Sequence, residues 1–147
     1  MNEDKTPLEL SGRCLCGAVT VTATASDPIL RACHCDMCQQ HTSSVFVNIR
    51  ADQDSIVMNG PVKVFKSSDW AQRAFCEECG STLWYGLIHD NSRNLAAGLF
   101  ENAGGAALAI EYFTDDCPQG YALAGDHQKL TRKQTFALFA PDEGEAQ

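Results

Sequence analysis

Cysteine is the residue type best placed to do chemistry in this chain, because it recurs at short, regular spacings. Seven of the eight cysteines form a C-x-C, a C-x-C-x2-C and a C-x2-C followed by glycine: Cys14, Cys16, Cys33, Cys35, Cys38, Cys76 and Cys79. Thiolates at such spacings bind zinc in a tetrahedral arrangement, with Zn–S bonds of about 2.3 Å. We therefore expect two zinc ions.

The two cysteine pairs predict one closed, structural zinc site. Residues i and i+2 of a strand face the same side, so Cys14 and Cys16 should present their sulfurs together. Cys76 and Cys79 have zinc-knuckle spacing, and Gly80 permits a positive φ after the second ligand. A tetrahedral site built from both pairs would cross-link an early strand to a turn much later in the chain.

The remaining triplet, Cys33, Cys35 and Cys38, has one ligand fewer than a closed site needs. Structural zinc sites are closed, whereas catalytic zinc keeps an open position. A second ion held by these three sulfurs with a vacant fourth position therefore favours an enzyme.

Other readings of the cysteines stay open. All seven could be scaffold, with His34, His41 or Asp36 closing the second site; His34 would point to the opposite face of a strand, whereas His41 is within helical reach of Cys38. A disulfide framework is disfavoured, because cysteine is scarcer here than in disulfide scaffolds. Cys117, alone before Pro118, reads as a half-buried thiol.

Charge and hydropathy restrict the partners. The formal charge is −8, and seven thiolates with two divalent ions would make it more negative, which argues against nucleic acid. No apolar run reaches the roughly 18 residues of a membrane span, and the polar segment Met1–Lys5 does not resemble a secretory signal. We expect a cytoplasmic protein, where closely spaced cysteines are more often metal ligands than disulfides.

The elements that must position these residues are mostly short strands. The expected extended segments are 18–23, 44–49, 55–58, 62–65, 71–76 leading into a turn, 81–85, 95–100 and 106–113. Asn59-Gly60 predicts a hairpin between two of them. Short helices are expected at 35–41 and 130–138. The chain reads as a single, mainly β domain over residues 1–147, with a core of roughly 10–140, a loose lead-in at 1–9 and an acidic tail at 141–147.

The cysteine motifs resemble those of the glutathione-dependent formaldehyde-activating enzyme (GFA) family, which includes S-(hydroxymethyl)glutathione synthase and the centromere protein V domain. The resemblance lies in Gly12–Val19, Cys33–Cys38 and Phe75–Ser81, with a weaker match at Asp115–Pro118 and Tyr121, and covers roughly residues 10–125. Gln39–Thr42 and Gly120-Tyr121 depart from the family's pattern.

The resemblance implies stacked, tent-like antiparallel β-sheets and a division of labour between two zinc ions. Cys14, Cys16, Cys76 and Cys79 match the family's structural zinc ligands. Cys33, Cys35 and Cys38 match the ligands of its catalytic zinc.

The resulting hypothesis is a carbon–sulfur lyase that acts on a small-molecule thiol, such as glutathione, and an aldehyde, such as formaldehyde. Zinc in a three-thiolate site can lower the pKa of an incoming thiol or polarise a carbonyl. The carboxylates of the thiol would need basic partners, and the candidates are Arg31, Arg50, Lys66 and Arg73; His34 could move a proton.

Two other functions compete with this hypothesis. The first is a zinc-stabilised protein-binding module with Trp70, Trp84, Tyr85 and Phe100 on its surface, although aromatic residues at strand spacing are more often core. The second is a redox or metal sensor that releases zinc on oxidation.

Overall fold

The computed structural model describes residues 6–139, and in that range strands dominate. Those residues form eleven strands and two short α-helices, so the mainly β prediction is confirmed. The described residues divide into two compact units: residues 6–30 with 47–107, and residues 31–46 with 108–139. The single-domain reading stays a prediction. The acidic tail expected at 141–147 lies outside the described residues.

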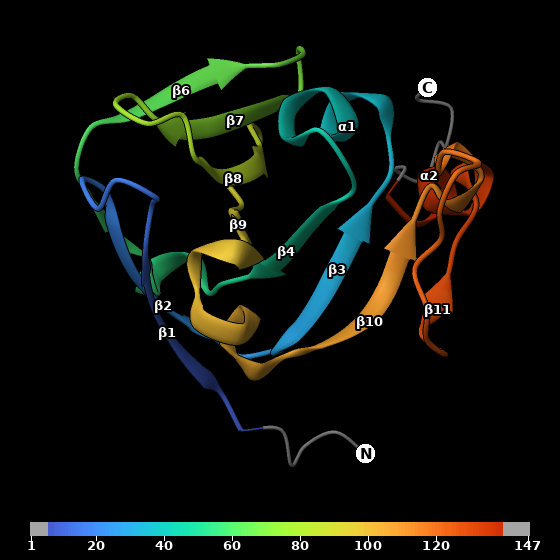
Figure 1. Cartoon of the computed structure of the whole chain (residues 1–147), viewed down its shortest axis with the longest axis horizontal. Helices are drawn as coiled ribbons and strands as arrows, with labels where there is room; N and C mark the ends of the chain where they lie inside the picture. Colours follow the sequence, from blue (N-terminus) through green and yellow to red (C-terminus); the bar gives the residue numbers. More distant parts are fainter. Residues whose placement is uncertain (1–5, 140–147) are drawn as a thin grey trace. The chain divides into compact units, whose positions relative to one another are not determined.

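The first unit contains a three-stranded antiparallel sheet in the order β1-β2-β5, and Figure 1 labels its first two strands. Its strands are β1 (Leu8–Arg13), β2 (Thr20–Ala25) and β5 (Val57–Asn59). The alternation expected in β2 is present, because Val21 and Ala23 are buried while Thr22 is exposed. Burying a side chain such as valine stabilises the fold by roughly 1.5–3 kcal/mol.

A second run of paired strands in this unit has the order β4-β9-β8-β7-β6. It consists of β4 (Phe46–Arg50), β9 (Asn94–Ala96), β8 (Thr82–Leu87), β7 (Ala71–Cys76) and β6 (Val62–Lys66). The pairing of β7 with β8 shifts register between Ala74 and Phe75. Such a bulge exchanges the two faces of a strand. The extra residue lies on β8, because Ala74 pairs with Trp84 while Phe75 pairs with Thr82. Leu83 and Trp84 are therefore neighbouring residues that are both buried.

The hairpin predicted at Asn59-Gly60 is wrong. β5 pairs with β2 and β6 pairs with β7, so the chain changes partners at this point instead of folding back on itself. Gly60 has φ +126°, and a Cβ on it would lie 2.2 Å from the carbonyl oxygen of Ala18. The glycine is required by this close approach and not by a two-residue turn.

Other predicted boundaries need correction. Only the start of the segment 95–100 is a strand, because the 3-10 turns η3 (Ala97–Leu99) and η4 (Glu101–Gly105) follow β9 directly. The expected lead-in already contains the first residues of β1. The predicted segment 55–58 contains the end of the 3-10 turn η2 (Gln53–Ser55) before β5 begins.

The second unit holds the triplet of cysteines. Its strands have the order β11-β10-β3, and it comprises β3 (Ile29–Cys33), α1 (Asp36–Thr42), β10 (Ala107–Tyr112), η5 (Thr114–Asp116), β11 (Gln128–Lys129) and α2 (Arg132–Phe139). Both predicted helices are present, whereas β3 and β11 were not foreseen. β10 and β11 pair in parallel, which departs from the antiparallel sheets that the family likeness implied. No helix in residues 6–139 is long and apolar enough to cross a membrane.

Gly60→Ala tests the close approach at the passage from β5 to β6. We expect the free energy of unfolding to fall by roughly 2 kcal/mol or more, because the methyl group adds a clash and a strained φ. Urea denaturation followed by circular dichroism would measure the change. Gly98→Ala is the matched control, since nothing lies within 4 Å of a Cβ at that position. Equal stability of the two variants would contradict the prediction.

Candidate metal centre

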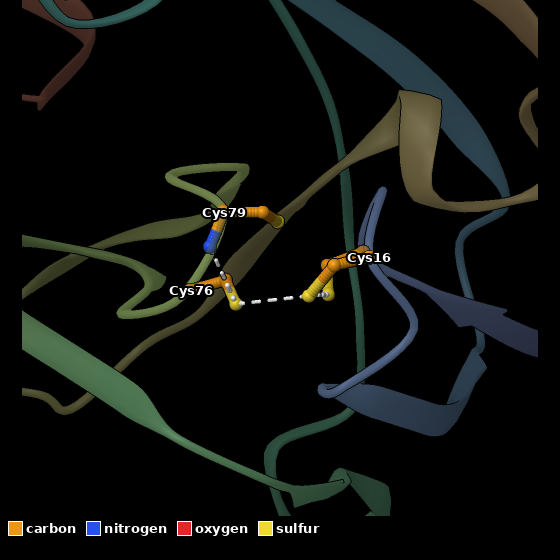
Figure 2. Close-up of side chains that lie close together, drawn as sticks. Cys16, Cys76 and Cys79 are labelled. Carbon is orange, nitrogen blue, oxygen red and sulfur yellow. Dashed lines mark hydrogen bonds between the residues drawn. The ribbon is translucent and has the colours of Figure 1, made fainter.

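Four sulfurs of the first unit lie within 4.8 Å of one another: those of Cys14, Cys16, Cys76 and Cys79. The sulfur of Cys16 is 3.6 Å from that of Cys14 and 3.8 Å from that of Cys76. Figure 2 shows Cys16 facing Cys76 and Cys79 from a separate loop. Four zinc–sulfur bonds of about 2.3 Å in a tetrahedron place the sulfurs about 3.8 Å apart. These residues therefore fit a tetrahedral thiolate-bound metal, and we name them the four-sulfur group.

Two tight turns present these sulfurs, each with a glycine after its second cysteine. Gly17 has φ +83° and donates its N–H to the carbonyl of Cys14; Gly80 has φ +80° and donates to the carbonyl of Cys76. The turn expected after Cys79 is thus present. The strand geometry expected for Cys14 and Cys16 is wrong, because β1 ends at Arg13 and the pair lies in the following turn.

Polar hydrogens converge on the sulfurs of the four-sulfur group. The amides of Val19, Ala18 and Cys79 lie 3.3–3.4 Å from the sulfurs of Cys14, Cys16 and Cys76, respectively. The hydroxyl of Ser81 accepts the N–H of Leu15 at 3.0 Å and lies 3.1 Å from the sulfur of Cys79, so it joins the two turns. Hydrogen bonds of this kind favour the charged form of a thiol.

The four thiols differ in their tendency to ionise. The hydroxyl and then the backbone of Ser81 lower the pKa of Cys79 to about 5. The amide of Ala18 lowers the pKa of Cys16, but burial and the three neighbouring thiols outweigh it and raise that pKa to about 12. Burial would raise the pKa of Cys14, yet the Val19 amide and the sulfurs of Cys16 and Cys76 shift it downward. Four thiolates at this distance need a cation among them.

The second unit brings together the sulfurs of Cys33, Cys35 and Cys38, all within 4.8 Å of one another. We name them the three-sulfur group. Cys33 ends β3, Cys35 is the N-cap of α1, and Cys38 is buried one turn into the helix. Hydrogen bonds with Cys35 and Cys38, followed by burial, raise the pKa of the Cys33 thiol far above its ordinary value. The crowding of sulfurs again suits a bound cation.

Among the described residues, no histidine or carboxylate completes the three-sulfur group. His41 lies in α1 and Asp36 in its first turn, but neither belongs to the group. His34 is fully buried, and its Nε2 lies 2.6 Å from Oε2 of Glu111. The described part of the chain therefore offers three ligand atoms here and four in the first unit.

The basic residues considered for substrate carboxylates lie in different surroundings. Arg73 is 2% exposed and lies over the ring of Tyr85, while Lys66 is exposed on β6. Arg50 borders a hollow of about 310 Å³ whose walls also carry Asp27, Asp52 and Asp90, together with Ser26, Ala51, Gln53, Ser92 and Arg93. Only Arg31 is in the same unit as the three-sulfur group, two residues before Cys33 on β3.

The aromatic surface considered for a binding module is mostly core. Trp84 is 5% exposed and Phe100 is 4% exposed, and Tyr85 is half-buried. Trp70 alone of the four is largely exposed, at 51%. These positions do not form a shared exposed face.

Sequence reasoning missed Ser81, Glu111 and His127. Ser81 follows the zinc-knuckle glycine directly, which is a usable signal. Glu111 contacts a histidine 77 residues away, so no local spacing reveals it.

Fold and donor atoms together define a class: a mainly β protein with two cysteine groups suited to metal ions. The family model of the glutathione-dependent formaldehyde-activating enzyme (GFA) matches residues 9–116. The chain belongs to this family.

One relative agrees with this assignment, and one solved structure shares the fold. A Schizosaccharomyces pombe (strain 972 / ATCC 24843) protein named uncharacterized lyase C29B12.13 is 32% identical over 127 residues, which cover 84% of this chain and 91% of that protein. The crystal structure of a Rhodobacter sphaeroides protein matches with a TM-score of 0.55 at 15% identity, covering 68% of this chain and all of the other. The second likeness supports the fold alone.

Substitution of one cysteine tests whether the four-sulfur group binds a structural metal. We expect Cys76→Ser to lose one metal equivalent and to lower the midpoint of thermal unfolding by about 10 °C or more, because a structural metal contributes directly to folding free energy. Elemental analysis and calorimetry would measure the two effects. Cys117→Ser is the control, because Cys117 belongs to neither group. An unchanged metal content in Cys76→Ser would contradict the assignment.

Proposed function

We propose that this protein is a zinc-dependent carbon–sulfur lyase whose active site is the three-sulfur group. The observation that carries the proposal is the difference between the two groups: within residues 6–139, one brings together four possible ligand atoms and the other three. Catalytic zinc sites keep a position for substrate, whereas structural sites are closed by protein ligands. In this proposal Cys14, Cys16, Cys76 and Cys79 hold the structural zinc, and Cys33, Cys35 and Cys38 hold the catalytic zinc.

The proposed type of reaction is supported by the family description and by the name of one relative. The family description names glutathione-dependent formaldehyde activation, and the Schizosaccharomyces pombe relative is named a lyase. We propose a glutathione-like thiol and a small aldehyde such as formaldehyde as substrates, joined as an S-hydroxymethyl adduct. A reducing compartment such as the cytoplasm would keep the cysteine ligands available, and we propose that location.

The proposed reaction forms one bond and moves one proton. The thiol sulfur attacks the aldehyde carbon, the π electrons of the carbonyl move to its oxygen, and the thiol proton ends on that oxygen; the lyase direction reverses these steps. A bound zinc ion would lower the pKa of the thiol and stabilise charge on the oxygen. The role of the chain in this proposal is to supply three sulfur ligands to the metal and to leave its fourth coordination position for the substrate.

Rigid local structure supports this holding role. Cys35 precedes α1, and its carbonyl accepts the N–H of Gln39 at 2.9 Å, which begins the helix. The hydroxyl of Thr42 donates to the carbonyl of Cys38 at 2.9 Å. The sulfurs of Cys35 and Cys38 are thus fixed by one short helix. Ligands held on rigid elements keep the geometry that a catalytic metal needs.

Arg31 is the basic residue that we propose for a carboxylate of the thiol substrate. Arg31 and Cys33 are both half-buried, while Ala32 between them is buried, as expected for two residues on one face of a strand. A guanidinium can donate two parallel hydrogen bonds to a carboxylate, which positions as well as attracts it.

Cys35→Ser tests the lyase activity. We expect loss of one zinc equivalent and a fall in S-hydroxymethyl adduct formation of at least about 100-fold, because stabilisation of a few kcal/mol is removed. Adduct formation can be followed by NMR with glutathione and formaldehyde, with zinc content measured on the same samples. The spontaneous reaction without protein sets the baseline.

Cys117→Ser serves as the matched control for Cys35→Ser and should keep both zinc and activity. Adduct formation at the wild-type rate in Cys35→Ser, after loss of the second zinc, would refute the lyase proposal. It would favour the alternative in which both zinc ions only stabilise a protein-binding module.

Arg31→Gln tests substrate recognition separately from metal binding. We expect the KM for glutathione to rise about 10-fold with little change in kcat, because a uniform binding contact is lost. Zinc content should stay unchanged. Lys66→Gln is the control, since Lys66 is exposed on β6 in the other unit. Equal KM values for both variants would remove Arg31 from the substrate site.

A further inference from the structure

A buried carboxylate in the second unit bridges two histidines. Oε2 of Glu111 lies 2.6 Å from Nε2 of His34, and Oε1 lies 2.6 Å from Nε2 of His127. The side chains are 6%, 0% and 2% exposed, respectively. None of the three belongs to either sulfur group.

The histidines donate to the carboxylate, which has no proton to give when it is ionised. Burial would raise the pKa of Glu111, but the hydrogen bonds from His127 and then His34 outweigh burial and lower it. Charge-assisted hydrogen bonds of this length are strong, and a buried carboxylate without them is costly. The three side chains therefore depend on one another.

His34 connects this trio to the three-sulfur group, because it lies between Cys33 and Cys35 in the chain. Its Nδ1 is buried and has no hydrogen-bond partner in the described part of the chain. Glu111 is thus the hydrogen-bond anchor of the ring. The ring in turn fixes the direction of the backbone that carries the two cysteines.

The backbone of His34 is held as well. Its N–H donates to the carbonyl of Tyr112 at 3.2 Å, and its carbonyl accepts Nε2 of Gln39 at 2.6 Å. The same Nε2 donates to the carbonyl of Asp116 at 3.1 Å. Main chain and side chain of His34 are therefore tied to β10 and to the segment that follows it.

We propose that Glu111 is a positioning residue for the three-sulfur group: by accepting hydrogen bonds from His34 and His127, it fixes the residue between Cys33 and Cys35 and so sets the directions of their sulfurs. The inference rests on the proposed function only in requiring a metal at this group. Partners that orient metal ligands typically change metal affinity 10–100-fold when they are removed. Glu111 acts on the three-sulfur group indirectly in this proposal: it contacts His34, whose backbone is joined to Cys33 and Cys35.

Glu111→Gln in the full-length protein tests the proposal. The glutamine oxygen can accept from one histidine, but its NH2 faces the other ring, which can accept it only by moving its own proton to Nδ1. The pair of hydrogen bonds to a charged carboxylate is lost in either case. We expect the dissociation constant of the more weakly held zinc to rise about 10- to 100-fold, with the tighter zinc unaffected. Competition with a chromophoric chelator measures both constants, and the absorption spectrum of the cobalt-substituted protein reports the geometry of each site.

Glu101→Gln is the control for loss of one carboxylate, because Glu101 is exposed. Two variants of His127 separate positioning from general stability. His127→Gln keeps a donor near the place of Nε2 and should retain near-wild-type affinity, whereas His127→Leu removes the donor and should weaken the second zinc. These two His127 variants test the positioning role even if Glu111→Gln does not fold.

Equal affinity for the second zinc in wild type, Glu111→Gln and His127→Leu would overturn the inference. If Glu111→Gln does not fold, equal affinity in the two His127 variants would overturn it as well. Weakened zinc binding in the variants, combined with no adduct formation by the fully loaded wild type, would refute the lyase function and leave the positioning role standing.

Discussion

Crowding of sulfur atoms is the constraint on which the structure depends. Sulfurs of the four-sulfur group lie as close as 3.6 Å, so their thiols cannot all ionise by themselves. Ser81 lowers the pKa of Cys79 to about 5. The pKa of Cys16, despite the hydrogen bond from the Ala18 amide, is raised to about 12 by burial and the three neighbouring thiols. A divalent cation bound by all four sulfurs would resolve the competition among these thiols, and it would stabilise the two turns that carry them in one arrangement.

The zinc-knuckle half of this group could be predicted from sequence because its geometry is local. The Cys76–Gly80 stretch needs a tight turn with a positive φ at its glycine, and both are present. The Cys14–Cys16 half was predicted to converge for the wrong reason. Its sulfurs approach through a turn closed by Gly17, and strand alternation has no part in it. Cysteine spacing therefore predicted correctly which sulfurs lie together. It did not predict correctly the secondary structure that brings Cys14 and Cys16 together.

The pairing of strands was harder to predict from the sequence than the positions of the strands themselves. Asn59-Gly60 has the composition of a hairpin, yet β5 and β6 pair with β2 and β7. What decides the conformation is the carbonyl of Ala18, which is distant in sequence and leaves room only for a glycine. The bulge opposite Ala74/Phe75 is a similar case, because it places Leu83 and Trp84 of β8 both in buried positions and depends on the register with β7. Both features are tertiary, so a pattern in one segment does not reveal them.

The buried trio in the second unit shows the same limit for polar residues. His34 was expected to face away from the sulfurs, which agrees with its absence from the three-sulfur group. Its partner Glu111 lies 77 residues later, and its burial is tolerated only because two donors meet it. Such a network is specified by the fold and not by spacing.

The two sulfur groups also differ in how strongly a metal bound to them would restrict the unfolded chain. The four-sulfur group joins residues 60 apart, so a metal there removes much conformational freedom from the unfolded chain. The three-sulfur group spans only six residues, and its closure restricts the unfolded chain far less. A metal at the first group is therefore suited to stabilise the fold. A metal at the second group would contribute less to folding, which accords with the proposal that this site serves catalysis and the first site serves stability.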